Sequence, residues 1–185
     1  MQETKQEAYY QLVGQIAMNW AALEAIVASA IWVIGGMHDA EGACVTSQIF
    51  NFDSKMKALR ALIGVKNEGD LTHLSDAHRK ALAELPDRLN TFFNKRLRSL
   101  LDYRNRLVHD PIRFEGGATQ RFQITAPGRL TLGFQPTDLE EMVEKRDAIA
   151  TAIDDLFEML KPAIEAFPGE LLSSADKSSK PPVQD

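Results

Sequence analysis

The chain has 185 residues, of which 44% are apolar and 25% are charged, enough for one domain with a buried core. The net charge of −5 argues against a surface that binds nucleic acid over its whole extent. The single cysteine, Cys44, excludes an intramolecular disulfide and is typical of a reducing compartment. We therefore expect a cytoplasmic protein, with one helical domain over residues 1–167.

The first expected helix covers about 4–34 and ends at Gly35-Gly36. Glu3 and Glu7 argue against a secretory signal peptide here. The stretch Ala21–Ile34 is strongly apolar, but it is shorter than the roughly 20 residues that a bilayer requires, and it carries Glu24. We expect a buried helix and no membrane span. Its apolar stripe has helical spacing and consists of Leu12, Ile16, Leu23, Val27, Ala30 and Ile34.

The middle of the chain predicts two further helices. One covers about 42–63 and stops at Gly64, with Ile49, Phe52, Met56, Leu59 and Ile63 on one face. After a polar loop, Ser75 is expected to cap a short helix that reaches Glu84. Pro86 then either breaks that helix or opens the next one at its first position.

The longest basic stretch falls on the next expected helix, at about 87–109. Residues 79–106 hold eight basic and three acidic residues, whereas the rest of the chain is strongly acidic. A solvated helix face explains this bias as well as a binding surface does. Arg104 lies where an apolar residue is expected on the stripe formed by Leu89, Phe93, Leu97, Leu100, Leu107 and Val108. Such an arginine is either paired with a carboxylate in the core or held at the floor of a groove. Glu24 is the first candidate for a core partner. If Arg104 does not pair with it, Arg60 is the alternative partner of that glutamate.

After Pro111 the hydrophobic pattern alternates with period two, which predicts a small antiparallel β hairpin or meander at about 112–134. Thr137 or Asp138 is expected to cap a last helix that reaches about residue 166. Residues 168–185 are polar and are expected to form a disordered tail. The predicted architecture is therefore a mainly α, up-and-down helical bundle with a small β insert.

The segment Tyr103-Arg104-Asn105-Arg106-Leu107-Val108-His109-Asp110 ends the basic helix. Arginine binds phosphate in bidentate fashion, and histidine exchanges protons near neutral pH. Asn105 and His109 share a helix face, so the amide is expected to orient the imidazole. For a histidine considered alone, a favourable interaction with the helix dipole is the better explanation, but with Arg104 and Asn105 beside His109 the two explanations are equally good.

The RNxxxH pattern of Arg104, Asn105 and His109 resembles the signature of the HEPN superfamily of helical domains, with Asp110 where a glycine often follows in that family. The resemblance implies a metal-independent endoribonuclease of toxin or defence type, with a composite site at a homodimer interface. It implies catalytic roles for Arg104, Asn105 and His109, and Tyr103, Arg106, Asp110 and Glu24 are expected to support them.

Two other interpretations remain open. One is a catalytically inactive HEPN-like domain that binds an antitoxin-like protein or a nucleotide, and the other is a purely structural helical protein. A metal or cofactor is not expected, because the sequence lacks a CxxC pair, an i,i+4 histidine pair, a GxxxxGK[ST] loop and a GxGxxG loop.

Overall fold

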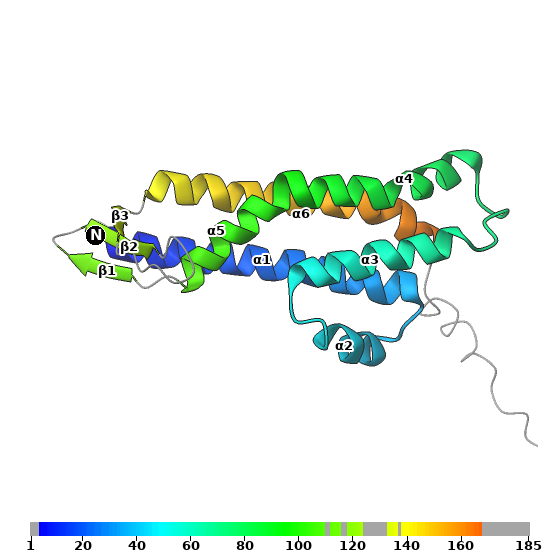
Figure 1. The fold of residues 1–185 in the computed structure, drawn as a ribbon, viewed down its shortest axis with the longest axis horizontal. Helices are drawn as coiled ribbons and strands as arrows, with labels where there is room; N and C mark the ends of the chain where they lie inside the picture. The colour runs from blue at the N-terminus through cyan, green and yellow to red at the C-terminus, as the bar shows by residue number, and fades with distance from the viewer. Residues whose placement is uncertain (1–3, 110–111, 116–117, 124–132, 137, 168–185) are drawn as a thin grey trace, which may run out of the picture. The chain divides into compact units, whose positions relative to one another are not determined.

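The computed structural model describes residues 4–109, 112–115, 118–123, 133–136 and 138–167. It is mainly helical, which confirms the predicted helical bundle (Figure 1). The predicted tail at 168–185 lies outside the described residues. The chain divides into two compact units, which are described separately: unit 1 comprises Met1–Leu23 and Asn94–Asp154, and unit 2 comprises Glu24–Phe93 and Asp155–Asp185.

Helix α1 (Lys5–Gly35) follows the predicted bounds closely, and all six residues of its predicted stripe are buried. Thr4 and Glu7 cap its start through reciprocal hydrogen bonds. The backbone amide of Thr4, and after it the Thr4 hydroxyl, donate to the Glu7 carboxylate and hold the pKa of Glu7 below its usual value. At the other end, Gly36 adopts φ 69°, and the amides of Gly36 and Met37 donate to Val33 and Trp32. This Schellman arrangement needs the left-handed glycine that the sequence supplies.

The predicted helix at 42–63 is in fact two helices, α2 (Asp39–Ser47) and α3 (Phe52–Asn67). Asn51 starts α3 by accepting a hydrogen bond from the amide of Ser54 at 2.7 Å. The prediction missed this cap because the apolar stripe continues across the break. Gly64 does not end α3, since an interior glycine weakens a helix by only about 1 kcal/mol.

Helix α4 (Asp76–Phe92) begins where predicted, with Ser75 accepting from the amide of His78. It does not stop at Pro86, which lies inside it. A proline has no N–H to donate to the carbonyl four residues earlier, here that of Leu82. Asn67 of α3 supplies the missing donor, because its Nδ2 lies 2.8 Å from that carbonyl oxygen. The contact joins two helices that run side by side and antiparallel (Figure 1).

After a π-helical turn, η1 (Phe93–Leu97), the chain continues as α5 (Arg98–His109). The strands β1 (Ile112–Glu115), β2 (Ala118–Gln123) and β3 (Gly133–Pro136) form one antiparallel sheet in the order β1-β2-β3. Ile112 pairs with Arg121, and Phe122 pairs with Phe134. Part of the predicted hairpin or meander, at 116–117 and 124–132, lies outside the described residues.

Helix α6 (Leu139–Ala166) is capped by the preceding Asp138, as predicted, because the Asp138 carboxylate accepts from the amide of Glu140 at 2.8 Å. Thr137, the other predicted cap, lies outside the described residues. Each unit has its own buried core. In unit 1 the core comes from the first part of α1, α5 and the first part of α6, including Ile16, Trp20, Leu100, Leu107, Met142 and Ile149. In unit 2 it comes from the remaining helical segments, including Val27, Ile34, Leu59, Ile63, Leu85, Leu89, Leu156 and Leu160.

Candidate functional site at the end of α5

The motif lies on the last turns of α5, in unit 1. Leu100, Tyr103 and Leu107, spaced three and four residues apart, form the buried face of this helix. The sequence placed Arg104 on that face, but Tyr103 fills the position, with only 4% of its surface exposed. Leu97, Leu100 and Leu107 of the predicted stripe are buried, whereas Val108 is 44% exposed. Between Leu100 and Leu107 the buried position is therefore three residues after Leu100, at Tyr103, and not four residues after it.

Arg104 is half-buried at the edge of the apolar face. Its Nη1 donates to Oδ1 of Asn105 at 3.0 Å, whereas its Nε is buried without a hydrogen-bond partner. No carboxylate among the described residues pairs with this guanidinium, which therefore keeps its charge available at the helix edge. A buried N–H without an acceptor costs free energy, but this atom is closed to solvent, so it is not itself a contact for an incoming phosphate.

The side-chain amide of Asn105 orients Arg104. The sequence predicted instead that this amide orients His109. His109, the last residue of α5, is exposed, and its ring makes no hydrogen bond within the described residues. Histidine in the last turn is favoured by the helix dipole, but exposure also leaves both ring nitrogens open to a substrate.

Glu24, the predicted partner of Arg104, has a different role. Its carboxylate pairs with Nζ of Lys55 at 3.3 Å, within unit 2. The two predicted arginine partners are both wrong: Arg104 donates to Asn105, and Arg60 donates to Asn90 at 2.7 Å. The error arose because sequence spacing shows which residues share one helix but not which helices meet.

The other expected supporting residues differ in their exposure and in their contacts. Tyr103 is buried, and Nζ of Lys145 from α6 lies 5.8 Å from the centre of its ring. Arg106 is exposed, and its Nε reaches back to the carbonyl oxygen of Asp102 at 3.4 Å. Asp110 lies outside the described residues. Lys145 was not identified from the sequence, because α6 carries no motif that marks it.

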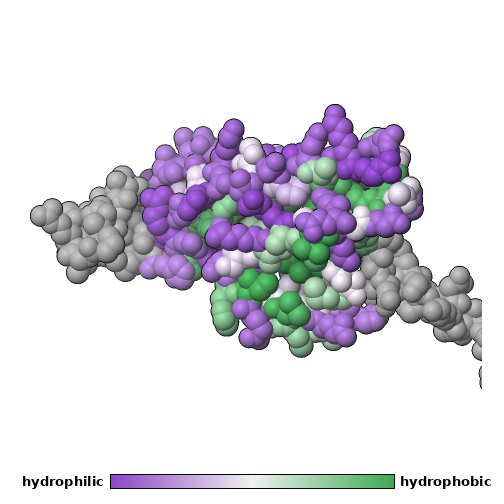
Figure 2. Space-filling view, turned by 45° about the vertical axis from the view of Figure 1, so that its right-hand side comes forward, coloured by the Kyte–Doolittle hydropathy of each residue, from purple (hydrophilic) through white to green (hydrophobic). Residues whose placement is uncertain are grey.

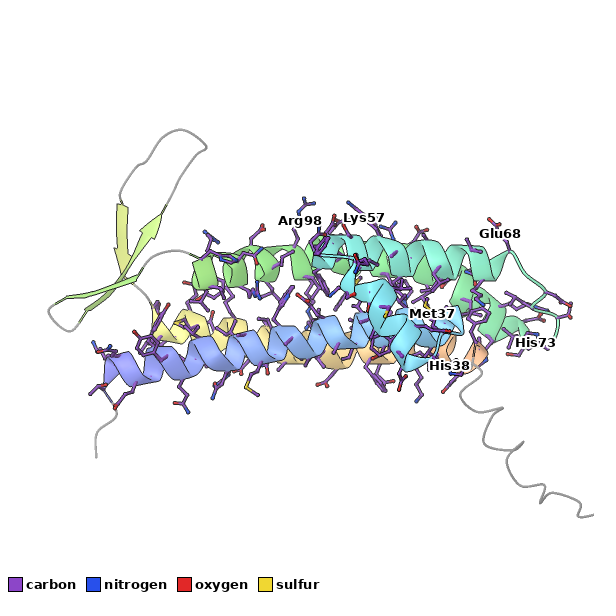
Figure 3. All side chains as sticks on the ribbon, turned by 90° about the horizontal axis from the view of Figure 1, so that it is seen from below. Met37, His38, Lys57, Glu68, His73 and Arg98 are labelled. Carbon is purple, nitrogen blue, oxygen red and sulfur yellow. The ribbon has the colours of Figure 1, made fainter. Side chains whose placement is uncertain are left out.

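The charges of α5 differ from those of unit 2. In unit 2 four cations lie next to acids, in the pairs Lys55–Glu24, Lys57–Asp53, Arg79–Asp76 and Lys80–Glu84, although Lys161 has no carboxylate partner among the described residues. On α5, three arginines (Arg98, Arg104 and Arg106) have no carboxylate partner in the described part of the chain. Arg98 extends outward from the start of the helix (Figure 3). The basic bias of the sequence is therefore not neutralised on this helix, as an anion-binding surface requires.

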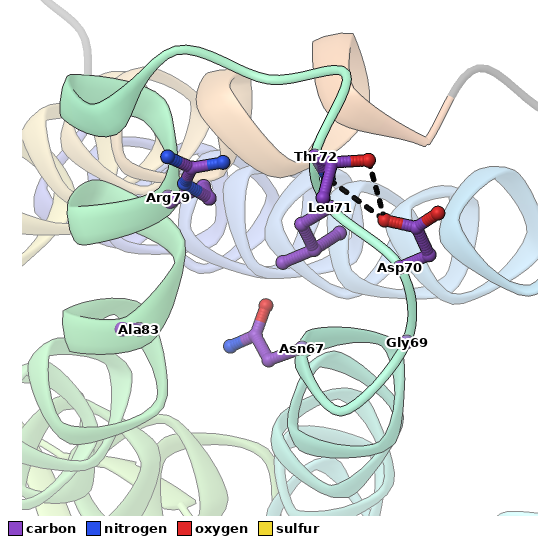
Figure 4. A pocket seen from close by; sticks show the side chains of 7 residues that line it. All are labelled: Asn67, Gly69, Asp70, Leu71, Thr72, Arg79 and Ala83. Carbon is purple, nitrogen blue, oxygen red and sulfur yellow. Dashed lines mark hydrogen bonds between the residues drawn. The ribbon is translucent and has the colours of Figure 1, made fainter.

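A pocket of about 400 Å³ lies elsewhere, where the end of α3 and residues 69–72 face α4 (Figure 4). Most of its polar groups already have partners, although the buried Oδ1 of Asn67 accepts no hydrogen bond within the described residues. Both the hydroxyl and the amide of Thr72 donate to Asp70, which holds the pKa of that carboxyl below its usual value. Arg79 pairs with Asp76, and Asn67 caps the Leu82 carbonyl. We therefore place no chemistry here.

A second surface of note is apolar. Phe50, between α2 and α3, is 91% exposed, and Val45 of α2 is 47% exposed. Figure 2 shows apolar side chains gathered near the lower edge of the view.

Among the described residues, no group of three or more His, Cys, Asp or Glu side chains is placed to hold a metal ion.

No protein-family model matches the chain, and no curated protein and no solved structure matches it significantly. Among the described residues, α1 is the one helix long and apolar enough to cross a membrane. Core helices of soluble proteins and N-terminal signal sequences meet the same criterion, and 33% of the most apolar part of α1 is buried.

Proposed function

We propose that the protein is a HEPN-like, metal-independent endoribonuclease that acts in the cytoplasm as a homodimer, with the strands of 112–136 as an insert in the helical domain. The observation that carries the proposal is the state of Arg104. Its guanidinium is held by Asn105 at the edge of α5, has no carboxylate partner among the described residues, and belongs to the same short motif as the exposed His109. The resemblance to the HEPN signature adds the expectation of RNA as substrate.

The chemistry requires three groups. A base removes the proton of the RNA 2′-OH, an acid protonates the leaving 5′-oxygen, and a cation stabilises the charge that develops on phosphorus. Histidine suits the two proton transfers at neutral pH, each of which typically contributes about 10²–10⁴-fold. Arg104 suits the third role, because a preorganised donor contributes roughly 10²–10³-fold. Asn105 then acts as a positioning residue that fixes the arginine.

One protomer does not supply the whole site. Arg104 and His109 are five residues apart and therefore project about 140° from each other around α5. A two-fold dimer resolves this, since the arginine of one copy then faces the histidine of the other. The Arg104 guanidinium, which has no carboxylate partner among the described residues, and the exposed His109 imidazole are the two halves that such a dimer would combine.

The test is incubation of the purified protein with mixed RNA in EDTA across pH 6–8. We expect cleavage that leaves 2′,3′-cyclic phosphate ends, while DNA of the same sequence survives because it lacks the 2′-OH. His109→Ala should abolish cutting without unfolding the protein, since the side chain is exposed. His73→Ala is the matched control, because His73 is also an exposed histidine and lies outside the motif. A folded wild-type protein that cuts no RNA, or cutting that persists in His109→Ala, would overturn the proposal.

The alternative is an inactive HEPN-like domain that binds a protein, such as an antitoxin-like partner. The exposed Phe50 and Val45 favour it, because a large exposed aromatic is typical of the centre of a protein interface. The net charge of −5 and the Asp110 that replaces the usual glycine agree with it. If RNA is not cut, a pull-down from the native host with wild type and Phe50→Ser is the deciding comparison.

A further inference from the structure

Lys145 of α6 is a cation that the structure places against the motif helix. Its Nζ lies 5.8 Å from the centre of the Tyr103 ring, and its side chain is half-buried. No carboxylate among the described residues pairs with it. The neighbouring Arg146, in contrast, is neutralised by Asp147, whose Oδ1 lies 2.8 Å from both Nε and Nη2. Lys145 is therefore a cation that this turn of α6 leaves available to a ligand.

The position of Lys145 continues a row of groups on α5. Tyr103, Arg106 and His109 follow at intervals of three residues, and residues three apart are neighbours on a helix surface. Arg106 and His109 are exposed, whereas Tyr103 is buried and carries Lys145 over its ring. The second arginine on this row, Arg106, and the imidazole of His109 thus follow Tyr103 along one i,i+3 ridge, which turns about 120° around α5 from the ring that carries the ammonium to the histidine. A chain of phosphates following this ridge would meet the ammonium and Arg106 before it reaches the histidine.

We propose that Lys145 binds a backbone phosphate of single-stranded RNA, and that the strand runs along Lys145, Arg106 and His109. The inference rests on the ribonuclease proposed above and names the path of its substrate. A lysine binds phosphate as a point charge, and contact with an aromatic ring restricts its motion before the RNA arrives. Because phosphate contacts carry no sequence information, Lys145 contributes affinity that is independent of base identity. It is a substrate-binding residue and takes no part in the proton transfers.

The probe is a fluorescein-labelled 2′-O-methyl oligouridine, which cannot be cut because its 2′-oxygen is blocked. Fluorescence anisotropy measures binding to the full chain at several salt concentrations. Lys145→Gln should weaken binding about tenfold at low salt, as expected for one charge-assisted hydrogen bond. The slope of log K against log salt should become shallower by about 0.7, the value for one lost phosphate contact on a single strand. Lys145→Arg should restore both quantities.

Lys161→Gln is the matched control, because Lys161 is an exposed lysine on the same helix, also without a carboxylate partner among the described residues. It should bind the probe like wild type. If wild type cuts RNA in EDTA but Lys145→Gln binds with unchanged affinity and slope, the inference is overturned and the ribonuclease proposal stands. The same holds if Lys145→Arg is as weak as Lys145→Gln, since the lysine would then matter for packing on Tyr103 and not for its charge. A wild type that neither cuts RNA nor binds the probe overturns both proposals.

Discussion

At the scale of single residues, the stability of α4 depends on a side chain from another helix. Pro86 removes the backbone donor that the carbonyl of Leu82 would use, and Asn67 replaces it at 2.8 Å. Leu82 is completely buried, so water does not easily take the place of Asn67. One residue of α3 thereby makes an interior proline acceptable in α4.

We expect Asn67→Ala to lower the free energy of unfolding by about 1–3 kcal/mol, because a buried carbonyl is left without a donor. In a Pro86→Ala background the new backbone N–H serves Leu82, and the same substitution should cost much less. Urea unfolding of the four proteins in this double-mutant cycle measures the difference. Equal costs in the two backgrounds would show that Asn67 does not compensate for the proline.

The pair of Glu24 and Lys55 is partly exposed, with 34% and 16% of the respective side chains accessible. It should therefore contribute less than the roughly 3–5 kcal/mol that is lost when a fully buried pair is broken. We expect a coupling energy of about 1 kcal/mol or less between Glu24→Gln and Lys55→Met, decreasing as salt is added. Thermal or urea unfolding at low and high salt tests this, and a coupling of several kcal/mol that salt does not reduce would contradict it.

At the scale of elements, α2 is fastened to α1 by the indole of Trp32. The ring lies against Gly42, its Nε1 donates to Thr46 at 3.1 Å, and the Thr46 hydroxyl donates to the Gly42 carbonyl at 2.8 Å. A Cβ built on Gly42 would lie 2.3 Å from Cγ of Trp32, close to the backbone end of that side chain, where it moves least. Gly42 is thus required for close approach and not for an unusual backbone angle.

Gly42→Ala should accordingly lower the free energy of unfolding by about 1–3 kcal/mol, the usual cost of overpacking. Gly64→Ala is the matched control, since a Cβ on Gly64 in the interior of α3 meets nothing within 4 Å. That substitution should stabilise the protein by about 0.5–1 kcal/mol, because alanine loses less backbone entropy in a helix. Differential scanning calorimetry distinguishes the two variants, and melting shifts of the same sign would refute the packing argument.

At the scale of the whole molecule, the proposed composite site requires two copies of the chain. We expect a two-fold homodimer with His109 near the interface, because no single α5 directs Arg104 and His109 to one phosphate. Light scattering at tens of micromolar measures the mass in solution. Mixing inactive His109→Ala with inactive Arg104→Ala should restore cutting, since a mixed dimer holds one intact site. A monomer, or a mixture that stays inactive, would count against the composite site.

Much of the fold was predictable because it depends on local interactions. The bounds of α1 and α6, the buried stripe of α1, the Ser75 cap and the glycine that ends α1 all follow from contacts within a few residues. The motif at the end of α5 was recognised for the same reason, since its residues are contiguous. The apolar pattern does not show the Asn51 cap between α2 and α3, so the prediction merged these two helices into one.

The sequence by itself determined the helical class, the apolar faces and the grouping of Arg104, Asn105 and His109 on one helix end. Only the tertiary structure decided which groups meet across helices: Lys55 with Glu24, Asn67 with the Leu82 carbonyl, and Lys145 with Tyr103. The physical reason is one of range. Helix periodicity and caps arise from neighbours along the chain, whereas these pairs join residues 15 to 42 positions apart, whose approach depends on how whole helices pack.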